Sequence, residues 1–296
     1  MHYVGRFAPS PSGPLHFGSL IAALGSYFQA KSCHGIWLVR IEDIDPPREI
    51  PGAASLILKT LEAYGLHWDK SVVYQSQRTE AYQTQIDHWL KEGTAYYCEC
   101  TRKAIKNAGG YYPGTCRNKK LENNGQRAVR LKMSEPVISF TDRKHGQLTI
   151  PTKLANEDFI IKRRDGLFAY NLAVVLDDID QGITEIVRGA DLIEPTGRQI
   201  SLYKILGQSP VSYVHLPLAL DNHGNKLSKQ NHAPAIDITH PKPALLDAMI
   251  FLGFEIMEDI KTAPVDEIIA WGVKNWQLSQ LPGTLKVTPR FSNAFV

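Results

Sequence analysis

Cysteine is scarce in this sequence, the net charge is small, and long apolar runs are missing. The 296 residues include four cysteines and carry a formal net charge of +3. So few cysteines in so long a chain exclude the dense disulfide framework of a small secreted domain. No run approaches the roughly 20 apolar residues that span a bilayer, and the opening residues MHYVGRFAPS lack the basic region and apolar run of a secretory signal. These absences predict a soluble, cytoplasmic protein with no membrane partner.

The first 97 residues alternate between strand-like and helix-like patterns. Strands are predicted at 3–7, 36–42 and 72–75, and helices at 18–31, 51–64 and 79–92. Such alternation predicts parallel strands with helices on both faces of the sheet. The run over 36–41 is apolar without a period of two, which is typical of a strand covered on both sides. The expected fold class is therefore α/β, a doubly wound parallel sheet of Rossmann type, with residues 1–97 forming its first half.

The pattern changes at about residue 98. Residues 98–160 are rich in Gly, Pro, Asn and Lys, with short β-like runs at 137–140 and 147–150, and indicate an insertion. The α/β pattern resumes over 161–235, with strands at 182–188 and 213–220 and a helix at 195–206. Helical patterns at 243–254 and 264–276 predict a short helical C-terminal region over 236–296.

The segment PSPSGPLHFGS, residues 9–19, is a candidate anion site between a strand and a helix. The first amides of a helix are unpaired, and the positive end of the helix dipole lies there. His16 would add a donor to a phosphate oxygen, and the prolines would fix the loop in advance. Taken alone, a histidine beside a turn is more often a surface or capping residue. The loop residues expected at the phosphates are Pro9, Ser10, Gly13, His16, Gly18 and Ser19.

A second candidate phosphate site, HGNKLSKQ at residues 223–230, follows the last clear strand. Lys226 and Lys229 bracket Ser228, and two lysines three positions apart can neutralise a polyphosphate as charge develops on a leaving group. A string of this kind is by itself more often a solvated loop. Its occurrence together with the segment 9–19 favours a polyphosphate site, for which Lys226, Ser228 and Lys229 are the candidate residues in this loop.

These two segments resemble the signatures of the class I aminoacyl-tRNA synthetases. LHFGS (15–19) is similar to their HIGH motif and KLSKQ (226–230) to their KMSKS motif, although Leu227 and Gln230 replace Met and the final Ser. RFAPSPSG (6–13), RIEDIDPPR (40–48) and DQGITEIVRGAD (180–191) resemble the glutamyl branch, and the resemblance covers residues 3–235. It implies that His16, Lys226 and Lys229 are catalytic and that Mg²⁺ accompanies ATP.

Glutamate as substrate would need its own set of charged side chains. Its second carboxylate suits a forked cation, for which Arg6 and Arg188 are the candidates. Its ammonium suits Glu42, which follows a strand at its carboxyl end, where ligands of open α/β sheets bind. The resemblance adds Ser10 and Tyr170 to this pocket. Two alternatives stay open: Arg6 and Glu42 could simply pair with each other, and Tyr170 could be a core residue.

Two clusters contain metal-ligating residue types. The acidic residues Asp177, Asp178 and Asp180 lie in a strand-and-turn context, which predicts turn residues rather than a metal site. Cys98, Cys100 and Cys116 offer three thiolates inside a loop-rich segment that would need a crosslink, and they predict one structural zinc ion. Tyr112 is the expected fourth ligand because C-x-C followed by Y-x-x-x-C resembles one synthetase relative. His145 is the chemically more usual rival, and reduced cysteines without a metal are the alternative.

The basic residues of the insertion suggest a nucleic-acid partner. Residues 98–132 hold nine Lys/Arg against two Glu, which predicts contacts with an RNA backbone, although a solvated loop would look the same. Only about 66 residues follow Gln230, too few for the helical domains with which glutamyl-tRNA synthetases read the anticodon, so no anticodon-binding domain is expected.

This short C-terminal region and the cysteine pattern resemble a particular branch of the family. That branch activates L-glutamate with ATP without needing tRNA and transfers it to the cyclopentene diol of queuosine in the anticodon loop of tRNA(Asp). Two rival functions remain, a truncated glutamyl-tRNA synthetase acting on the 3′ end of tRNA(Glu) and a catalytically idle zinc- and RNA-binding homologue. A monomer is expected.

Overall fold

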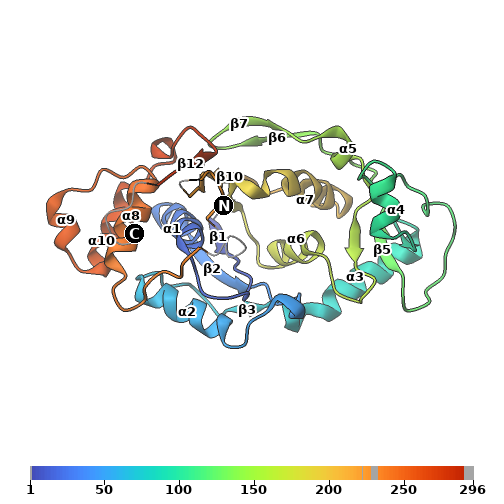
Figure 1. Cartoon of the computed structure of the whole chain (residues 1–296), viewed down its shortest axis with the longest axis horizontal. Coiled ribbons are helices and arrows are strands. Elements are labelled where there is room, and N and C mark those ends of the chain that lie inside the picture. The colour runs from blue at the N-terminus through green and yellow to red at the C-terminus, as the bar shows by residue number, and fades with distance from the viewer. Residues whose placement is uncertain (1, 222, 228–232, 290–296) are drawn as a thin grey trace.

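The structure, a computed structural model, describes residues 2–221, 223–227 and 233–289. Its elements follow one another as strands and helices around a central sheet (Figure 1). The helices are α1 (Phe17–Ser32), α2 (Ala53–Ala63), α3 (Thr79–Glu92), α4 (Arg102–Asn107), α5 (Thr152–Ala155), α6 (Tyr170–Asp180), α7 (Ile193–Ile205), α8 (Lys242–Phe251), α9 (Glu258–Thr262) and α10 (Val265–Asn275). The strands are β1 (Val4–Phe7), β2 (Ile36–Ile41), β3 (Val73–Tyr74), β4 (Ala95–Cys98), β5 (Ala128–Leu131), β6 (Ser139–Asp142), β7 (Gly146–Thr149), β8 (Ile160–Lys162), β9 (Glu185–Gly189), β10 (Ser212–Leu216), β11 (Leu218–Ala219) and β12 (Lys286–Val287).

The central strands run parallel, as the alternating sequence pattern predicts. Strand β1 pairs with β2, β2 with β3, and β9 with β10, all in parallel register. The amide of Thr184, just before β9, donates to the carbonyl of Val4 at 2.9 Å, so β9 lies at the free edge of β1. The spatial order β3–β2–β1–β9–β10 is that of a doubly wound sheet, in which ligands bind where the order reverses.

Both faces of this sheet are buried. Trp37 and Val39 of β2 and Val214 of β10 pack in a core with α1, α8 and α10. Leu38, between the first two, packs on the opposite face with Tyr213 of β10 and with α7. Because successive side chains point to opposite faces, a strand covered on both sides favours apolar residues at successive positions, which explains the apolar run Ile36–Val39 of β2; the buried Arg40 that follows pairs with Asp178.

The segment 98–160 leaves the sheet and returns to it. Strand β5 pairs antiparallel with β4 and with β8; Cys98 ends β4, and Cys100, α4 and Cys116 lie between β4 and β5 along the chain. The β6–β7 hairpin then runs back toward β10 along the top of the view in Figure 1, and the Arg143 amide donates to the Tyr213 carbonyl at 2.9 Å. The part of this segment that holds α4 is thus remote from the central sheet, whereas the β6–β7 hairpin contacts it.

Two expectations about local structure are wrong. Asp177, Asp178 and Asp180 lie in helix α6 rather than in turns, because Leu172–Val175 form the buried face of a helix instead of a strand. The strand predicted over 213–220 is interrupted at Pro217, which has no amide hydrogen for the ladder, and divides into β10 and β11. Among the described residues, no helix is long and apolar enough to cross a membrane.

Candidate active site

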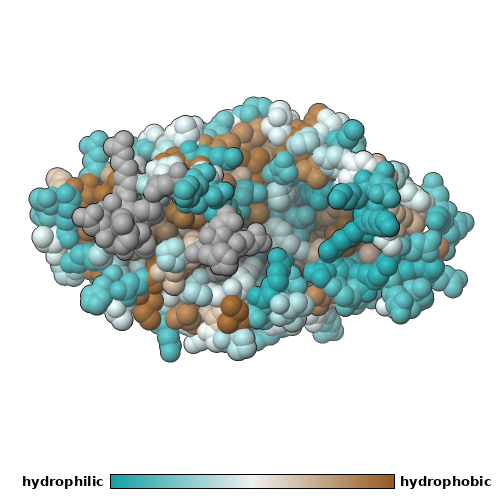
Figure 2. Space-filling model, viewed as in Figure 1, coloured by the Kyte–Doolittle hydropathy of each residue, from teal (hydrophilic) through white to brown (hydrophobic). Residues whose placement is uncertain are grey.

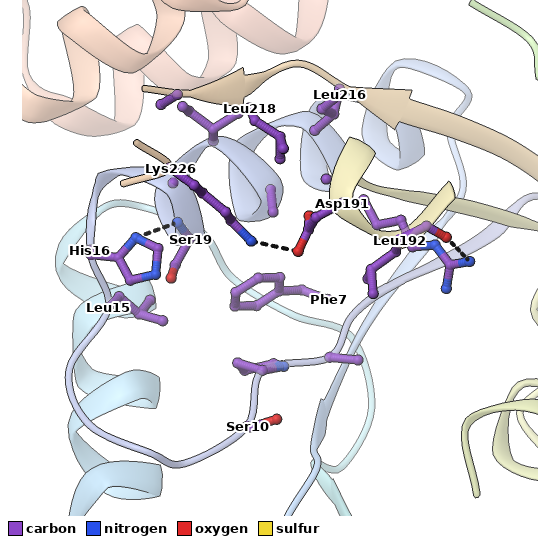
Figure 3. A pocket seen from close by; sticks show the side chains of 18 of the residues that line it. Phe7, Ser10, Leu15, His16, Ser19, Asp191, Leu192, Leu216, Leu218 and Lys226 are labelled. Carbon is purple, nitrogen blue, oxygen red and sulfur yellow. Dashed lines mark hydrogen bonds and ion pairs between the residues drawn. The ribbon is translucent and has the colours of Figure 1, made fainter. Parts of the chain in front are cut away.

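A cavity of about 460 Å³ opens at the carboxyl ends of β1 and β9, beside the start of α1 (Figure 3). Most of the side chains expected from the sequence to bind ATP or glutamate line it. These are Arg6, Pro9, Ser10, His16, Gly18, Ser19, Glu42, Tyr170, Arg188 and Lys226. Gly13 lies in the same loop, where its φ of 130° favours glycine, but does not line the cavity. Ser228 and Lys229 lie outside the described residues.

His16 is the N-cap residue of α1. Its Nδ1 accepts a hydrogen bond from the Ser19 amide at 3.3 Å, so the neutral ring carries its proton on Nε2. The ring thus satisfies one amide of the helix terminus and keeps its other nitrogen as a donor. This is the polarity that a phosphate oxygen requires.

The loop that carries Lys226 comes close to the start of α1. A Cβ on Gly18 would lie 2.9 Å from the Leu227 carbonyl oxygen and 3.1 Å from Cε1 of His16. Glycine is therefore the residue that permits this approach. The Leu227 amide donates to the Ala219 carbonyl at 2.8 Å, which ties the loop to β11. The two segments that resemble the synthetase signatures meet at one end of the cavity.

Lys226 forms an ion pair with Asp191 at the cavity wall, as Figure 3 shows. Both side chains are about one-third exposed, so solvent and a competing anion can reach the pair. The sequence analysis assigned Asp191 no role, although it closes the quoted string 180–191. A phosphate bound here would compete with Asp191 for the lysine.

Arg188 is a buried cation without a carboxylate partner among the described residues. Its Nη2 donates to Thr196 Oγ1 and Gln199 Oε1 at 2.7 Å each and to the Leu192 carbonyl at 3.3 Å. Its Nη1 is buried and has no hydrogen-bond partner within the described part of the chain. Because an unpaired buried charge is costly, this arginine at the cavity wall is arranged for an anionic ligand.

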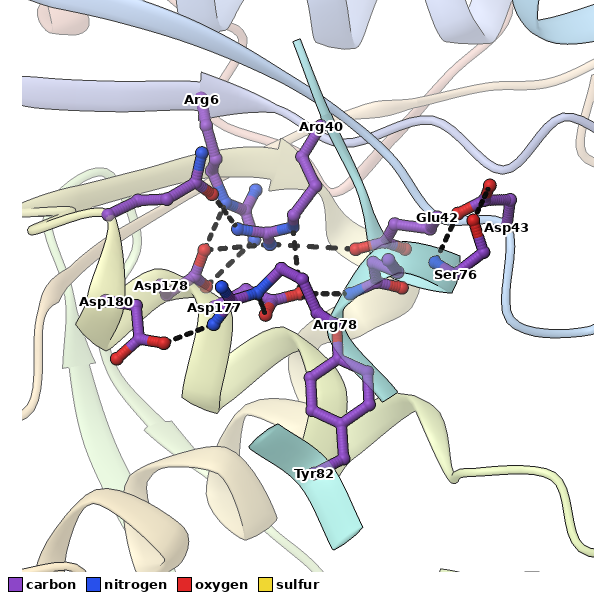
Figure 4. A network of polar contacts seen from close by, with 12 residues as sticks. Arg6, Arg40, Glu42, Asp43, Ser76, Arg78, Tyr82, Asp177, Asp178 and Asp180 are labelled. Atoms are coloured by element: carbon purple, nitrogen blue, oxygen red, sulfur yellow. Dashed lines mark hydrogen bonds and ion pairs between the residues drawn. The ribbon is translucent and has the colours of Figure 1, made fainter. Parts of the chain in front are cut away.

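Arg6, by contrast, already has its counter-ion. Its Nε and Nη2 donate to the two carboxylate oxygens of Asp178 at 3.1 and 3.3 Å (Figure 4). Asp178 also pairs with Nη2 of Arg40 at 2.8 Å. The alternative that Arg6 pairs with Glu42 is therefore wrong, because its partner is Asp178.

Glu42 lies at the edge of the same network and lines the cavity. Its Oε1 is 3.7 Å from Nη2 of Arg40 and accepts no hydrogen bond from the described residues. Burial raises the pKa of Glu42 to about 7, against the opposing influence of Arg40 and Arg6. A buried carboxylate with an open acceptor suits an ammonium group. Tyr170, the first residue of α6, also lines the cavity and is only partly buried, so it is not simply a core residue.

The charged network extends behind the cavity through α6. Asp177 accepts hydrogen bonds from Arg78, Gln75 and Tyr82, and lies 3.7 Å from Arg40. The sequence analysis missed the roles of Arg40, Asp177 and Asp178. The signal that would have found them is the helical spacing of 170–180, which places these two aspartates on the buried side.

The three cysteines of the 98–160 segment lie together. Their sulfur atoms are all within 4.8 Å of one another, and Cys100 and Cys116 are 3.6 Å apart. Two sulfurs bound at about 2.3 Å to one tetrahedral zinc lie about 3.8 Å apart, so the cluster fits a single ion. Burial alone raises the pKa of the Cys98 thiol, but hydrogen bonds from the Cys100 amide and the Arg130 guanidinium hold it below its usual value.

The structure also separates the two candidates for a fourth ligand. Tyr112 packs with the cysteines, and its phenol oxygen accepts a hydrogen bond from the Cys116 amide at 2.7 Å. His145 lies in the β6–β7 hairpin, where its Nε2 donates to the His215 carbonyl at 2.8 Å. His145 is therefore not beside the cysteines.

This chain is similar to known proteins both in sequence and in structure. A family model described as "tRNA synthetases class I (E and Q), catalytic domain" matches residues 3–269. A protein named Glutamyl-Q tRNA(Asp) synthetase from Vibrio parahaemolyticus is 72% identical over 294 residues, covering 99% of both chains. A protein of the same name from Salmonella typhimurium is 57% identical, covering 99% of this chain and 98% of that one.

Among solved structures, a glutamate tRNA ligase from Elizabethkingia meningosepticum in complex with its amino acid is similar, with a TM-score of 0.78 and 25% identity. The match covers 99% of this chain and 67% of that one. The chain belongs to the class I tRNA synthetases of the glutamate and glutamine branch, and within them to the group of the glutamyl-Q tRNA(Asp) synthetases.

Proposed function

We propose that this protein activates L-glutamate with ATP, without needing tRNA, and transfers the glutamate to queuosine in the anticodon loop of tRNA(Asp). The observation that carries the activation step is the cavity itself. It combines a helix N-terminus capped by His16, the loop that carries Lys226, and the buried Arg188, whose Nη1 has no hydrogen-bond partner among the described residues. The names of the full-length relatives support queuosine in tRNA(Asp) as the acceptor.

Glutamate binds through two of its charged groups, its side-chain carboxylate and its ammonium. Its side-chain carboxylate binds Arg188, whose buried Nη1 is available, and its ammonium binds Glu42. Arg6 lines the same cavity, but Asp178 compensates its charge. Arg6 therefore contributes to the shape of the pocket and to its electrostatic potential, and does not act as an unpaired cation. Ser10 and Tyr170 complete the pocket.

Activation follows from the placement of the α-carboxylate beside the phosphate site. This carboxylate attacks the α-phosphate of ATP in line, and pyrophosphate leaves. His16 donates from Nε2, and Lys226 exchanges Asp191 for a phosphate, so both stabilise the charge that develops. Lys229 has the same role by its place in the signature. The Mg²⁺ expected with ATP would supply further neutralisation of the phosphates.

In the second step, a hydroxyl of the acceptor attacks the acyl carbon of the adenylate and AMP leaves. RNA is held by exposed basic residues of the 98–160 segment, at the hydrophilic end of the molecule that holds α4 (Figure 2). Arg102, Lys103 and Lys106 of α4 are exposed and take part in no ion pair of the described residues, whereas Arg130 is buried beside Cys98. Backbone phosphates are the groups that such side chains bind.

One assay tests this function directly. Glutamate-dependent exchange between ATP and pyrophosphate is measured without RNA, and transfer of labelled glutamate is then measured with tRNA that contains or lacks queuosine. We expect exchange without RNA and transfer only to queuosine-containing tRNA(Asp). Absence of exchange contradicts every synthetase function. Transfer to tRNA(Glu) without queuosine supports the truncated glutamyl-tRNA synthetase instead.

One structural zinc ion is held by Cys98, Cys100 and Cys116, with Tyr112 as fourth ligand. Three thiolates, a neutral Tyr112 phenol and Zn²⁺ carry a net charge of −1, which the buried Arg130 guanidinium 3.3 Å from the Cys98 sulfur balances. Metal analysis should give about one equivalent of zinc per chain, lowered by Cys100→Ser. A folded, active, zinc-free preparation would contradict the structural role of zinc.

The protein is expected to be a monomer in solution.

A further inference from the structure

Asp142 and His215 lie directly behind Arg188 and do not line the cavity. Asp142 ends β6, and His215 lies in β10; both side chains are fully buried. Oδ2 of Asp142 accepts hydrogen bonds from the His215 amide at 2.9 Å and from its Nδ1 at 2.8 Å. The carboxylate can only accept here, so the proton of the neutral imidazole is on Nδ1, and Nε2 presents a lone pair.

That lone pair faces Arg188. Nε of Arg188 is 3.4 Å from Nε2 of His215 and donates to it. Thr196 Oγ1, 3.2 Å from the same Nε2, gives its proton to the Leu192 carbonyl and accepts from Nη2 of Arg188. Nε and Nη2 of the guanidinium are therefore fixed by neighbours, and Nη1 is the nitrogen that has no partner among the described residues.

We propose that the Asp142–His215 pair is a positioning device for the substrate-binding guanidinium of Arg188, holding it with Nη1 available to the substrate's side-chain carboxylate. The inference rests on the proposed binding of glutamate at Arg188. It gives the β6–β7 hairpin a function: this hairpin, part of the 98–160 segment, supplies the carboxylate that sets the histidine tautomer. Asp142 and His215 thus act through Arg188 and do not touch the substrate.

The electrostatics of the pair agree with this arrangement. Burial, together with the nearby Arg188, holds the pKa of His215 below its usual value, against the opposing effect of Asp142. His145 faces the His215 carbonyl and also disfavours a charged ring. Hydrogen bonds from His215 and from the His145 and Lys144 amides outweigh burial and lower the pKa of Asp142. A neutral histidine beside an ionised aspartate is the state that presents an acceptor to Arg188.

Two variants of His215 separate positioning from packing. The centroid of the His215 ring lies 6.1 Å from that of the Tyr213 ring, on which it stacks, and the ring also packs against Phe140. His215→Phe therefore retains an aromatic ring but removes the Nε2 acceptor. His215→Gln supplies a carbonyl acceptor near the position of Nε2. In glutamate-dependent exchange, the Phe variant should raise KM for glutamate about tenfold or more, since hydrogen bonds to charged groups are worth roughly 1.5–3 kcal/mol. KM for ATP should change less than twofold.

The Gln variant should recover most of the loss. The ratio of kcat/KM for glutamate over glutamine should fall in the Phe variant, because a misplaced cation distinguishes a carboxylate from an amide less well. An unchanged KM for glutamate in a folded Phe variant, or equal increases in KM for ATP and glutamate, would overturn the proposal. Absence of exchange in the unaltered protein would instead overturn the proposed function.

A spectroscopic measurement tests the same device in the unaltered protein, where the tautomer of His215 can be observed directly. In the protein with ¹⁵N-labelled histidine, the His215 signals are identified by their loss in the Gln variant. They should show a proton on Nδ1 and none on Nε2, unchanged between pH 6 and pH 8. In Asp142→Asn either orientation of the amide turns its NH₂ group toward backbone N–H groups that the carboxylate accepts, so the hold on Nδ1 should weaken and KM for glutamate should rise. A proton on Nε2 in the unaltered protein would refute the proposal.

Discussion

Replacing Asp178 with Asn should destabilise the protein strongly, because this carboxylate is the shared counter-ion of two buried arginines. Its side chain is 1% exposed and pairs with Nε of Arg6 at 3.1 Å and Nη2 of Arg40 at 2.8 Å. Without its charge, the nearest remaining carboxylates to Arg40 are those of Asp177 and Glu42, both at 3.7 Å. Removing one partner of a buried pair costs about 3–5 kcal/mol.

Asparagine preserves the shape and one acceptor, so we expect the lower end, about 3 kcal/mol of unfolding free energy. For a chain of this size that loss lowers Tm by roughly 6–12 °C. Asp180→Asn is the matched control. It lies in the same helix and, within the described part of the chain, pairs only with Arg78, but its side chain is 56% exposed, so its loss should cost less than about 1 kcal/mol.

The pH dependence gives a second, independent measurement. Although burial acts against it, the charges of Arg40 and Arg6 lower the pKa of Asp178 below its ordinary value. A carboxyl group with a depressed folded-state pKa stabilises the protein above its ordinary pKa of about 4, and this contribution disappears as the pH falls through the folded-state value. Denaturant unfolding at pH 7 should therefore separate Asp178→Asn from the unaltered protein by more than at pH 3. Equal losses for Asp178→Asn and Asp180→Asn, or a difference independent of pH, would refute the argument.

Three further predictions concern the cavity. His16→Ala should lower ATP–pyrophosphate exchange by about 100-fold, the scale of losing one preorganised donor to a developing charge; an unchanged rate would remove His16 from the mechanism. Gly18→Ala should raise KM for ATP severalfold, because its Cβ would lie 2.9 Å from the Leu227 carbonyl oxygen, whereas Gly283→Ala, with nothing within 4 Å, should not. KM for glutamate should fall about tenfold from pH 6 to pH 8, because only ionised Glu42, whose pKa is about 7, binds the ammonium. The Glu42→Gln variant should bind glutamate weakly at every pH. If KM for glutamate in this variant depends on pH as it does in the unaltered protein, Glu42 is not the group that titrates.

Much of the catalytic fold could be read from local patterns. The helix predicted over 79–92 has those bounds in the structure, and α1 and β2 differ from their predicted ranges by one residue at each end or fewer. The two helices have long apolar periodicities, and β2 begins with a run of β-branched, aromatic and other apolar residues that follows Gly35, so local sequence specifies all three well. The run 172–176 could not be assigned in this way, since a short apolar run fits a buried strand and a buried helix equally.

The binding residues divide along similar lines. The signatures around His16 and Lys226 and the strings containing Arg6, Glu42 and Arg188 could be found from sequence, and the structure brings these five side chains to one cavity. Which charges compensate one another could not be found, because ion pairs between residues 172 positions apart, such as Arg6 and Asp178, leave no periodic signal.

The sequence by itself therefore determined the parallel α/β sheet, the family resemblance and the membership of the cavity, because these depend on local periodicity and short contiguous motifs. The tertiary structure alone decided that Arg6 has an internal counter-ion while Arg188 has none among the described residues, and that Asp142 of a distant hairpin reaches Arg188 through His215. The physical reason is that a buried charge is balanced by whichever groups the fold brings within a few ångströms, wherever they lie in the chain.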